Sequence, residues 1–420
     1  MSNAIRIDDL AHPELTPVQQ AAVQYGETIQ VDFSVDGILD IARGRTGLSD
    51  FGPDDFVQRL RILCEEWGGD TANNNLHRSV LHNYLVRYAS NRLLIQDTWK
   101  KHPEILQENI ERPVIVVGLP RSGTTHLVNL LAADKRFHSL PLWESYEPAP
   151  MADERALPDG TDPRYQRCLE AWLGMQQMLP LLAAMHPMNP DHIHEELELM
   201  GPDFASYNFE WLAPCPRFRD HYFATDQTPH YRYMRDVLKL IQWRRGGAQG
   251  KRWVLKCPQH LEQLPALMRV FPDATVAVTH RDPVAVVQSA VTMLAYGERM
   301  RRREVDPKAL LDYWGDRIEH LLRACVRDRP QLPAAQAVDV PFHEFMADDV
   351  AMVEKILGRA GLEVTAESRA QLADFMREHP RGKEGRIVYD LRNDFGTEPA
   401  ALRERFRFYF DRFPEVREEV

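Results

Sequence analysis

The segment from Gly118 to Thr125, GLPRSGTT, combines glycine, arginine and hydroxyl side chains in a spacing suited to binding a phosphate group. It stands between a β-branched run, residues 114–117, and an apolar stretch, residues 127–131. A buried strand, a glycine-containing turn and a helix N-terminus bring several backbone N–H groups to one anion. The spacing nearly matches the triphosphatase loop G-x-x-x-x-G-K-[ST], but Thr124 stands at the lysine position. We expect a terminal 5′-phosphate to contact Pro120, Arg121, Ser122, Gly123, Thr124 and Thr125.

A second candidate anion site is the segment THRDPVAVVQS. Arg281 follows a predicted strand, Asp282 is a suitable helix N-cap, and Pro283 suits the first helical turn. Ser289 comes eight residues after Arg281, about two turns along the predicted helix, so both side chains can flank one ligand. An arginine and a serine that converge in this way predict a site for a second phosphate.

The elements that must position these residues alternate between strand and helix. Predicted strands cover residues 114–117, 253–257 and 275–280, and predicted helices cover residues 260–270 and about 283–294. A parallel sheet with ligands at the carboxyl ends of its strands follows from this alternation. We predict an α/β fold of three layers (α/β/α, P-loop-like) around a central parallel sheet. Two further helices are predicted near residues 347–360 and 366–378.

Helical patterns also precede and interrupt this core. Leu76, Val80, Leu81, Tyr84, Leu85 and Tyr88 recur at helical spacing after a possible cap at Asn73–Asn75. We predict an N-terminal helical region over residues 1–110 and a main domain over residues 111–420. Residues 151–250, rich in aromatic residues, methionine and proline, are expected to form a helical insertion. This insertion is expected to form a small core of its own, a lid with an apolar acceptor pocket, or both.

The composition excludes some partners. Acidic residues outnumber basic ones, 62 to 51, and the net charge of −11 argues against general nucleic-acid or anionic-membrane binding. The N-terminal residues do not resemble a signal peptide, and no apolar run approaches the length of a membrane span. Five cysteines without CxxC spacing predict reduced thiols and a cytoplasmic location. A homo-oligomer is compatible with the sequence.

The loop PRSGTT resembles the 5′-phosphosulfate loop of sulfotransferases that use 3′-phosphoadenosine 5′-phosphosulfate (PAPS), in their bacterial, tyrosyl-protein and heparan branches. The Arg281/Ser289 pair is similar to that family's 3′-phosphate motif. The tail residues Arg381, Gly382 and Lys383 are similar to the segment that closes over the 3′-phosphate in its members. The resemblance implies transfer of a sulfuryl group from PAPS to a hydroxyl of a small acceptor, with 3′-phosphoadenosine 5′-phosphate (PAP) as product and no metal.

The resemblance also implies a cation and a base. Lys256, in WVLKCPQHL, matches the lysine that contacts the donor in the tyrosyl-protein and bacterial branches, and Arg121 is expected to assist it. Glu144, in LPLWESYEP, stands where the tyrosyl-protein and heparan branches carry their basic glutamate. It follows the loop helix where a second strand is expected to end.

Other bases remain open. His260 corresponds to the histidine base of the cytosolic branch if the alignment gap is placed there. The segment HPMNPDHIHEE, with His186, His192, His194, Glu195 and Glu196, lines the acceptor site, supplies a base, or begins a helix. A metal site is not expected, because the HxH spacing is short and no third ligand is evident. One alternative function is a P-loop nucleotide kinase or NTPase, but this sequence lacks the lysine that such a loop carries. A second alternative is an inactive nucleotide-binding scaffold.

Overall fold

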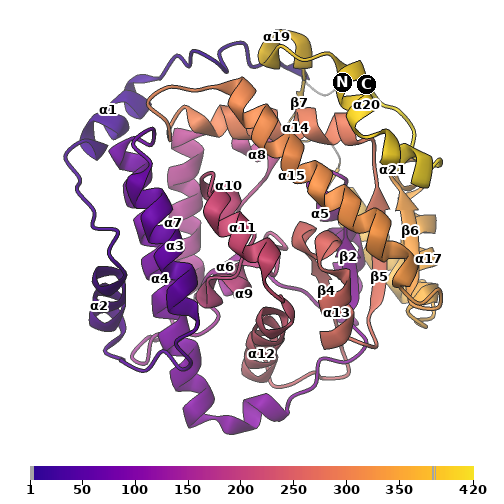
Figure 1. Ribbon diagram of the computed structural model, residues 1–420. Helices are drawn as coiled ribbons and strands as arrows, with labels where there is room; N and C mark the ends of the chain where they lie inside the picture. The colour runs from indigo at the N-terminus through magenta and orange to yellow at the C-terminus, as the bar shows by residue number, and fades with distance from the viewer. Residues whose placement is uncertain (1–3, 381–382, 384) are drawn as a thin grey trace.

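A central parallel sheet organises the chain. In the computed structural model, which describes residues 4–380, 383 and 385–420, five strands pair in the order β3-β4-β2-β5-β6 (Figure 1). Their bounds are β2 (Val114–Val117), β3 (Phe137–His138), β4 (Arg252–Lys256), β5 (Thr275–His280) and β6 (Ala337–Pro341). Strand β2 lies between β4 and β5, and all its pairings are parallel. The segments that follow these three strands therefore meet at one edge of the sheet.

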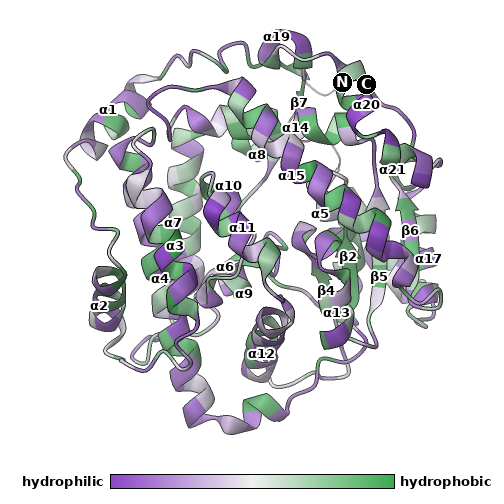
Figure 2. Ribbon diagram, viewed as in Figure 1, coloured by the Kyte–Doolittle hydropathy of each residue, from purple (hydrophilic) through white to green (hydrophobic). Residues whose placement is uncertain are grey.

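Helices cover both faces of the sheet, as predicted. Val114 and Val116 face one helical layer, whereas Ile115 and Val117 face the other, because successive side chains of a strand point to opposite sides. The first layer contains α5 (Thr124–Ala132), α16 (Phe342–Ala347), α17 (Asp349–Arg359) and α18 (Ala366–Glu378). The second contains α12 (Thr228–Arg244), α13 (Leu264–Val270), α14 (Pro283–Glu298) and α15 (Pro307–Asp328). Strand β2 and helix α14 are correspondingly apolar (Figure 2).

The N-terminal helices share a core with part of the insertion. Phe56, Leu60 and Leu85 pack with Phe204 and Phe209 in one buried cluster. The N-terminal elements are α1 (Pro17–Gly26), α2 (Val35–Thr46), α3 (Phe56–Gly69), α4 (Asn75–Lys101) and η1 (Pro103–Gln107). Those of the insertion before α12 are α7 (Pro163–Met178), α8 (Leu182–Met185), α9 (Leu197–Met200), η2 (Gly201–Asp203), α10 (Asn208–Leu212) and α11 (Pro216–Ala224). The division into separate regions therefore stays a prediction.

The C-terminal tail packs on α14 and α15 and pairs with the N-terminal strand. Strand β1 (Ala4–Ile5) pairs in parallel with β7 (Arg386–Ile387). The remaining elements are α6 (Leu142–Tyr146), η3 (Pro258–Glu262), η4 (Arg329–Gln331), α19 (Leu391–Phe395), α20 (Pro399–Arg405) and α21 (Arg407–Arg412). Within the described part of the chain, every helix is too short or too polar to cross a lipid bilayer.

Three local predictions need correction. The helix predicted over residues 260–270 is a 3₁₀ turn, η3, followed by α13, because Pro258 and Pro265 each start a new helical turn. The second strand, β3, ends at His138 rather than at Glu144, which lies in α6. The predicted buried face of α4 holds at Leu81, Leu85 and Tyr88, but Val80 is exposed.

Candidate functional site

The predicted anion-binding segments meet at the carboxyl edge of the sheet. The loop from Gly118 to Gly123 follows β2, Lys256 ends β4, and Arg281 follows β5. Val116 pairs with Lys256, and Val117 pairs with Val278. The loop is therefore flanked by a lysine on one side and an arginine on the other, because β4 and β5 are the two neighbours of β2.

The loop has the backbone geometry of an anion cradle. Arg121 and Gly123 adopt left-handed conformations with φ of 66° and 86°, and this conformation is uncommon for a non-glycine residue such as Arg121. A Cβ on Gly118 would lie 1.9 Å from Thr279 Oγ1, so only glycine fits between β2 and β5. Helix α5 begins at Thr124, and the first N–H groups of a helix have no partner within it. These N–H groups can bind an anion.

The side chains of the two predicted phosphate sites contact each other directly. Arg281 Nη1 donates to the backbone carbonyl of Arg121 at 2.7 Å. Arg121 Nε donates to Ser289 Oγ at 3.0 Å, and Ser289 Oγ donates to the hydroxyl of Tyr389 at 2.9 Å. Ser122 Oγ instead donates to the carbonyl of Leu119 at 2.6 Å. Sequence analysis missed Tyr389, which comes from the tail and carries no motif of its own.

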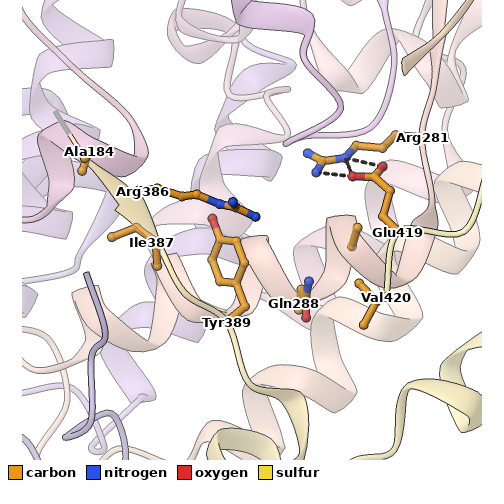
Figure 3. A pocket seen from close by; sticks show the side chains of 10 residues that line it. Ala184, Arg281, Gln288, Arg386, Ile387, Tyr389, Glu419 and Val420 are labelled. Atoms are coloured by element: carbon orange, nitrogen blue, oxygen red, sulfur yellow. Dashed lines mark hydrogen bonds and ion pairs between the residues drawn. The ribbon is translucent and has the colours of Figure 1, made fainter. Parts of the chain in front are cut away.

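A cavity of about 310 Å³ lies beside this cluster. Arg281, Arg386, Tyr389 and Glu419 are among its lining residues, and Figure 3 shows Arg281 and Glu419 paired directly with each other at its wall. Arg281 Nη2 lies 2.7 Å from Glu419 Oε2, and Arg281 Nε lies 2.9 Å from Glu419 Oε1. The guanidinium also stacks on Phe342, 4.0 Å from the ring centroid. The carboxylate of Glu419, which comes from the tail, therefore binds the Arg281 guanidinium, the group that was predicted to bind a phosphate.

Lys256 joins the loop to the insertion. Its side chain is fully buried, and its ammonium group donates to Thr125 Oγ1 at 3.2 Å and forms an ion pair with Glu195. The backbone N–H of Lys256 donates to Glu196 Oε1 at 2.9 Å. Glu195 and Glu196 reach this position because the N–H of His194 donates to the carbonyl of Leu140 at 2.8 Å. The insertion is thus bonded to the segment that follows β3.

Glu144 is placed with different partners. Its carboxylate forms an ion pair with Arg245, at the end of α12. The Arg245 guanidinium also donates to the carbonyl of Ser139 at 3.0 Å and lies 5.1 Å from the centroid of the Trp253 ring. Glu144 therefore pairs with Arg245, whereas the ion-pair partner of Lys256 is Glu195.

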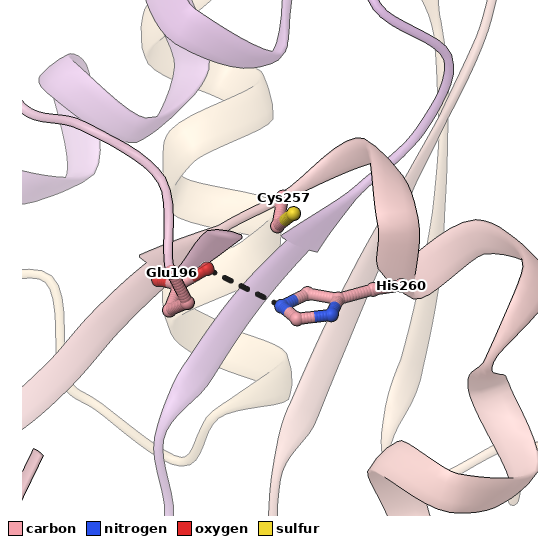
Figure 4. A group of neighbouring side chains, drawn as sticks. All are labelled: Glu196, Cys257 and His260. Atoms are coloured by element: carbon pink, nitrogen blue, oxygen red, sulfur yellow. Dashed lines mark hydrogen bonds and ion pairs between the residues drawn. The ribbon is translucent and has the colours of Figure 1, made fainter. Parts of the chain in front are cut away.

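His260 belongs to a buried hydrogen-bond network. Its Nδ1 is 2.8 Å from the hydroxyl of Tyr231, and its Nε2 is 3.3 Å from Glu196 Oε2. Glu196, Cys257 and His260 bring their possible ligand atoms within 4.8 Å of one another (Figure 4). The contact between His260 and Glu196 accounts for this cluster, because it links η3 to the insertion. Both ring nitrogens of His260 are therefore engaged.

Three histidines of the insertion form a cluster. The ring centroids of His186, His192 and His194 lie 5.6–6.4 Å apart. Burial and the positive charge of Lys256 lower the pKa of His192 to about 3. Burial also lowers the pKa of His186 and His194 well below their usual range, with contributions from neighbouring histidines and Lys256. The three rings are neutral at pH 7.

The predicted closing loop is described only in part. Arg381 and Gly382 lie outside the described residues, and Lys383 lies in an exposed turn. The residues just beyond it, Arg386 and Tyr389, line the cavity next to Arg281.

Comparisons with known proteins identify the family. The family model described as "Sulfotransferase family" matches residues 113–366, more than half of the chain. The chain belongs to the sulfotransferase family. Sulfotransferase STF1 from Mycobacterium tuberculosis H37Rv is a similar solved structure, with 29% identity, a TM-score of 0.77, and coverage of 90% of this chain and 99% of that one. Sulfotransferase STF9 from Mycobacterium avium has 25% identity, a TM-score of 0.80, and coverage of 93% and 100%. No curated protein sequence matches the chain.

This sulfotransferase is a transferase with a mixed α/β fold, as its sequence predicted. Its structural likeness to two mycobacterial sulfotransferases extends beyond the family match into the N-terminal helices. The alternative of a P-loop kinase is not favoured, since the matches are to sulfotransferases.

Proposed function

We propose that this sulfotransferase moves the sulfuryl group of PAPS to a hydroxyl of a small apolar acceptor by in-line displacement. The observation that carries the proposal is the contact between the two anion-binding corners, in which Arg281 donates to the Arg121 carbonyl at 2.7 Å. Two phosphates on one adenosine require two cationic sites within the span of a single nucleotide. The loop and the β5–α14 corner fit that requirement.

Each corner has a role in this proposal. The N-terminus of α5, with Thr124 and Thr125, binds the 5′-phosphosulfate, and Arg121 and Ser122 belong to the same loop. Arg281 and Ser289 bind the 3′-phosphate. The resemblance to the family assigns Arg381, Gly382 and Lys383 to the same phosphate, and of these three only Lys383 lies within the described residues.

Lys256 stabilises the negative charge that develops on the departing phosphate oxygen. It contacts Thr125 of the loop at 3.2 Å, and it is fully buried. A fixed cation in a water-poor site is worth about 3–4 kcal/mol at a developing oxyanion. No metal enters this scheme.

The surroundings of the loop support an apolar acceptor. Arg121 donates to the carbonyl of Met185, and the adjacent Leu181, Leu182 and Met188 are only partly buried. The aromatic residues Phe204 and Phe209, by contrast, are fully buried in the core shared with the N-terminal helices. An alcohol, phenol, sterol or lipid is therefore expected to contact the segment around α8.

The cellular setting proposed is cytoplasmic, because all five cysteines are buried, unpaired thiols. The acceptor is expected to be a small molecule rather than a nucleic acid, and a homo-oligomer remains compatible with this arrangement.

Calorimetric titration with PAP and with ATP·Mg²⁺ tests the proposed donor. We expect PAP to bind and ATP·Mg²⁺ to bind at least tenfold more weakly, since the loop lacks the lysine that holds β- and γ-phosphates, an effect of about 1.4 kcal/mol or more. Tighter binding of ATP·Mg²⁺ would contradict the proposal and favour a kinase. A chain that binds PAP but transfers no sulfuryl group from PAPS to any hydroxyl would be a nucleotide-binding scaffold.

A further inference from the structure

We propose that Glu195, rather than Glu144 or a histidine, is the base that removes the proton from the acceptor hydroxyl. This inference rests on the proposed function, because it assumes that PAPS is bound at the loop. Glu195 is the carboxylate in contact with Lys256, and Lys256 is in turn in contact with the loop. The Lys256 ammonium group therefore lies between Glu195 and the loop at which sulfuryl transfer is expected.

The position of Glu195 is fixed by its neighbours. Glu196 accepts one hydrogen bond from the backbone N–H of Lys256 at 2.9 Å and contacts His260 at 3.3 Å, and it is fully buried. Ile193 forms an antiparallel bridge with Pro141. Anchored on both sides, Glu195 keeps 11% of its side chain exposed, whereas the side chain of Lys256 has none. The carboxylate is therefore held firmly and still reachable by an acceptor.

The ammonium group of Lys256 can serve both ends of the reaction. It carries three protons, of which two point to Thr125 Oγ1 and to Glu195 in the described part of the chain. In the proposed complex the third is donated to the oxygen that leaves with the 5′-phosphate. The same cation thus orients the base and stabilises the leaving group.

The proposed step balances as follows. The acceptor O–H proton passes to a carboxylate oxygen of Glu195 while a new bond forms between the acceptor oxygen and sulfur. The bond between sulfur and the 5′-phosphate oxygen breaks, and its electron pair stays on the phosphate, next to Lys256. Glu195 then releases its proton to water. The products are a sulfate ester and PAP.

The rival groups are less suitable as bases. Glu144 forms its ion pair with Arg245, whose guanidinium lies over Trp253, and Lys256 pairs with Glu195 instead. Burial and nearby positive charge lower the pKa of His194 well below its usual range, which makes its imidazole a weak base. Both ring nitrogens of His260 have partners. His192 Nε2 and His194 Nδ1 have no hydrogen-bond partner among the described residues, and they suit orienting the acceptor.

The test compares Glu195→Gln, Glu195→Asp and Glu144→Gln with wild type. The matched control is Glu147→Gln, which removes a surface carboxylate that pairs with Arg167. Calorimetry with PAP measures donor-site integrity. Release of sulfate from PAPS measures transfer to water, a hydroxyl acceptor that is always present. Transfer to 4-nitrophenol measures an acceptor that ionises near neutral pH and needs little help from a base.

We expect E195Q to release sulfate about 10²-fold more slowly than wild type, while PAP binds at least as tightly because the neighbouring negative charge that offsets Lys256 is removed. E195D, which keeps the charge on a shorter side chain, should be intermediate, and it serves as the decisive variant if E195Q does not fold. The loss should shrink with 4-nitrophenol wherever the enzyme accepts it. E147Q should match wild type.

Three results would overturn the proposal: sulfate release by E195Q above one third of wild type, a loss in E144Q as large as that in E195Q, or an equal loss with water and with 4-nitrophenol. The last result would indicate a purely structural role. A folded wild type that fails to bind PAP would instead remove the donor assignment, and the base assignment with it.

Discussion

The ion pair between Arg281 and Glu419 leads to a quantitative prediction about nucleotide binding. Both side chains are partly exposed, 21% and 29%, so the pair contributes about 0.2–1 kcal/mol in water. A 3′-phosphate that binds Arg281 must first displace Glu419. Replacing Glu419 with glutamine removes this competition and should tighten PAP binding by about 1.4- to 5-fold.

The assay is calorimetric titration at low and high salt, with two matched controls. Glu418→Gln removes the neighbouring carboxylate, which pairs with Arg403, and should leave PAP affinity unchanged. Adenosine 5′-phosphate, which lacks the 3′-phosphate, should bind E419Q and wild type equally. The gain for PAP should diminish at high salt, because salt screens exposed charges. Weaker PAP binding by E419Q, or an equal gain for both nucleotides, would refute the reasoning.

Further predictions address the second corner, the loop and the buried histidines. Arg281→Ala should weaken PAP binding by about 1.5–3 kcal/mol, or roughly 10- to 150-fold, as expected for a charged hydrogen bond, and unchanged affinity would remove the 3′-phosphate assignment. Gly118→Ala should destabilise the fold by about 1–3 kcal/mol through its clash with Thr279, whereas Gly174→Ala, in an open helical position, should stabilise it by about 0.5–1 kcal/mol in urea unfolding. His192 has a pKa of about 3 in the folded chain and an ordinary pKa of about 6.5 in the unfolded chain. Between about pH 6.5 and pH 3 the unfolded chain therefore binds a proton on His192 that the folded chain does not. The free energy of unfolding consequently falls as the pH drops below about 6.5. His192→Asn should therefore lose about 2 kcal/mol less stability than wild type between pH 6.5 and pH 5, and identical pH profiles would contradict this.

The sheet and its phosphate loop were predictable because their signals are local. The β-branched run at residues 114–117, the glycines of the loop and the Asp282 cap each constrain the backbone within a few residues. Asp282 does cap α14, accepting from the N–H of Val284 at 2.8 Å. The alternation of strands and helices then predicted a parallel sheet, with Lys256 and Arg281 near the loop at the carboxyl ends of its strands.

The features that sequence analysis missed depend on long-range contacts. Glu195 pairs with Lys256, 61 residues later, and only the folding of the insertion onto the end of β4 brings them together. Glu419 reaches Arg281 across 138 residues, with no sequence signal for the tail's path. Strand β3 is two residues long, too short for a recognisable alternating pattern, so the expected position of Glu144 at a strand end was wrong.

A structure of the PAP complex tests the central claim most directly, since that claim places two phosphates of one nucleotide in two adjoining corners. We predict phosphate oxygens within hydrogen-bond distance of the backbone N–H groups of Thr124 and Thr125 at one end. At the other end, the 3′-phosphate should contact Arg281 and Ser289, with Glu419 displaced. A nucleotide bound elsewhere, or one held by the loop with its 3′-phosphate away from Arg281, would contradict the account.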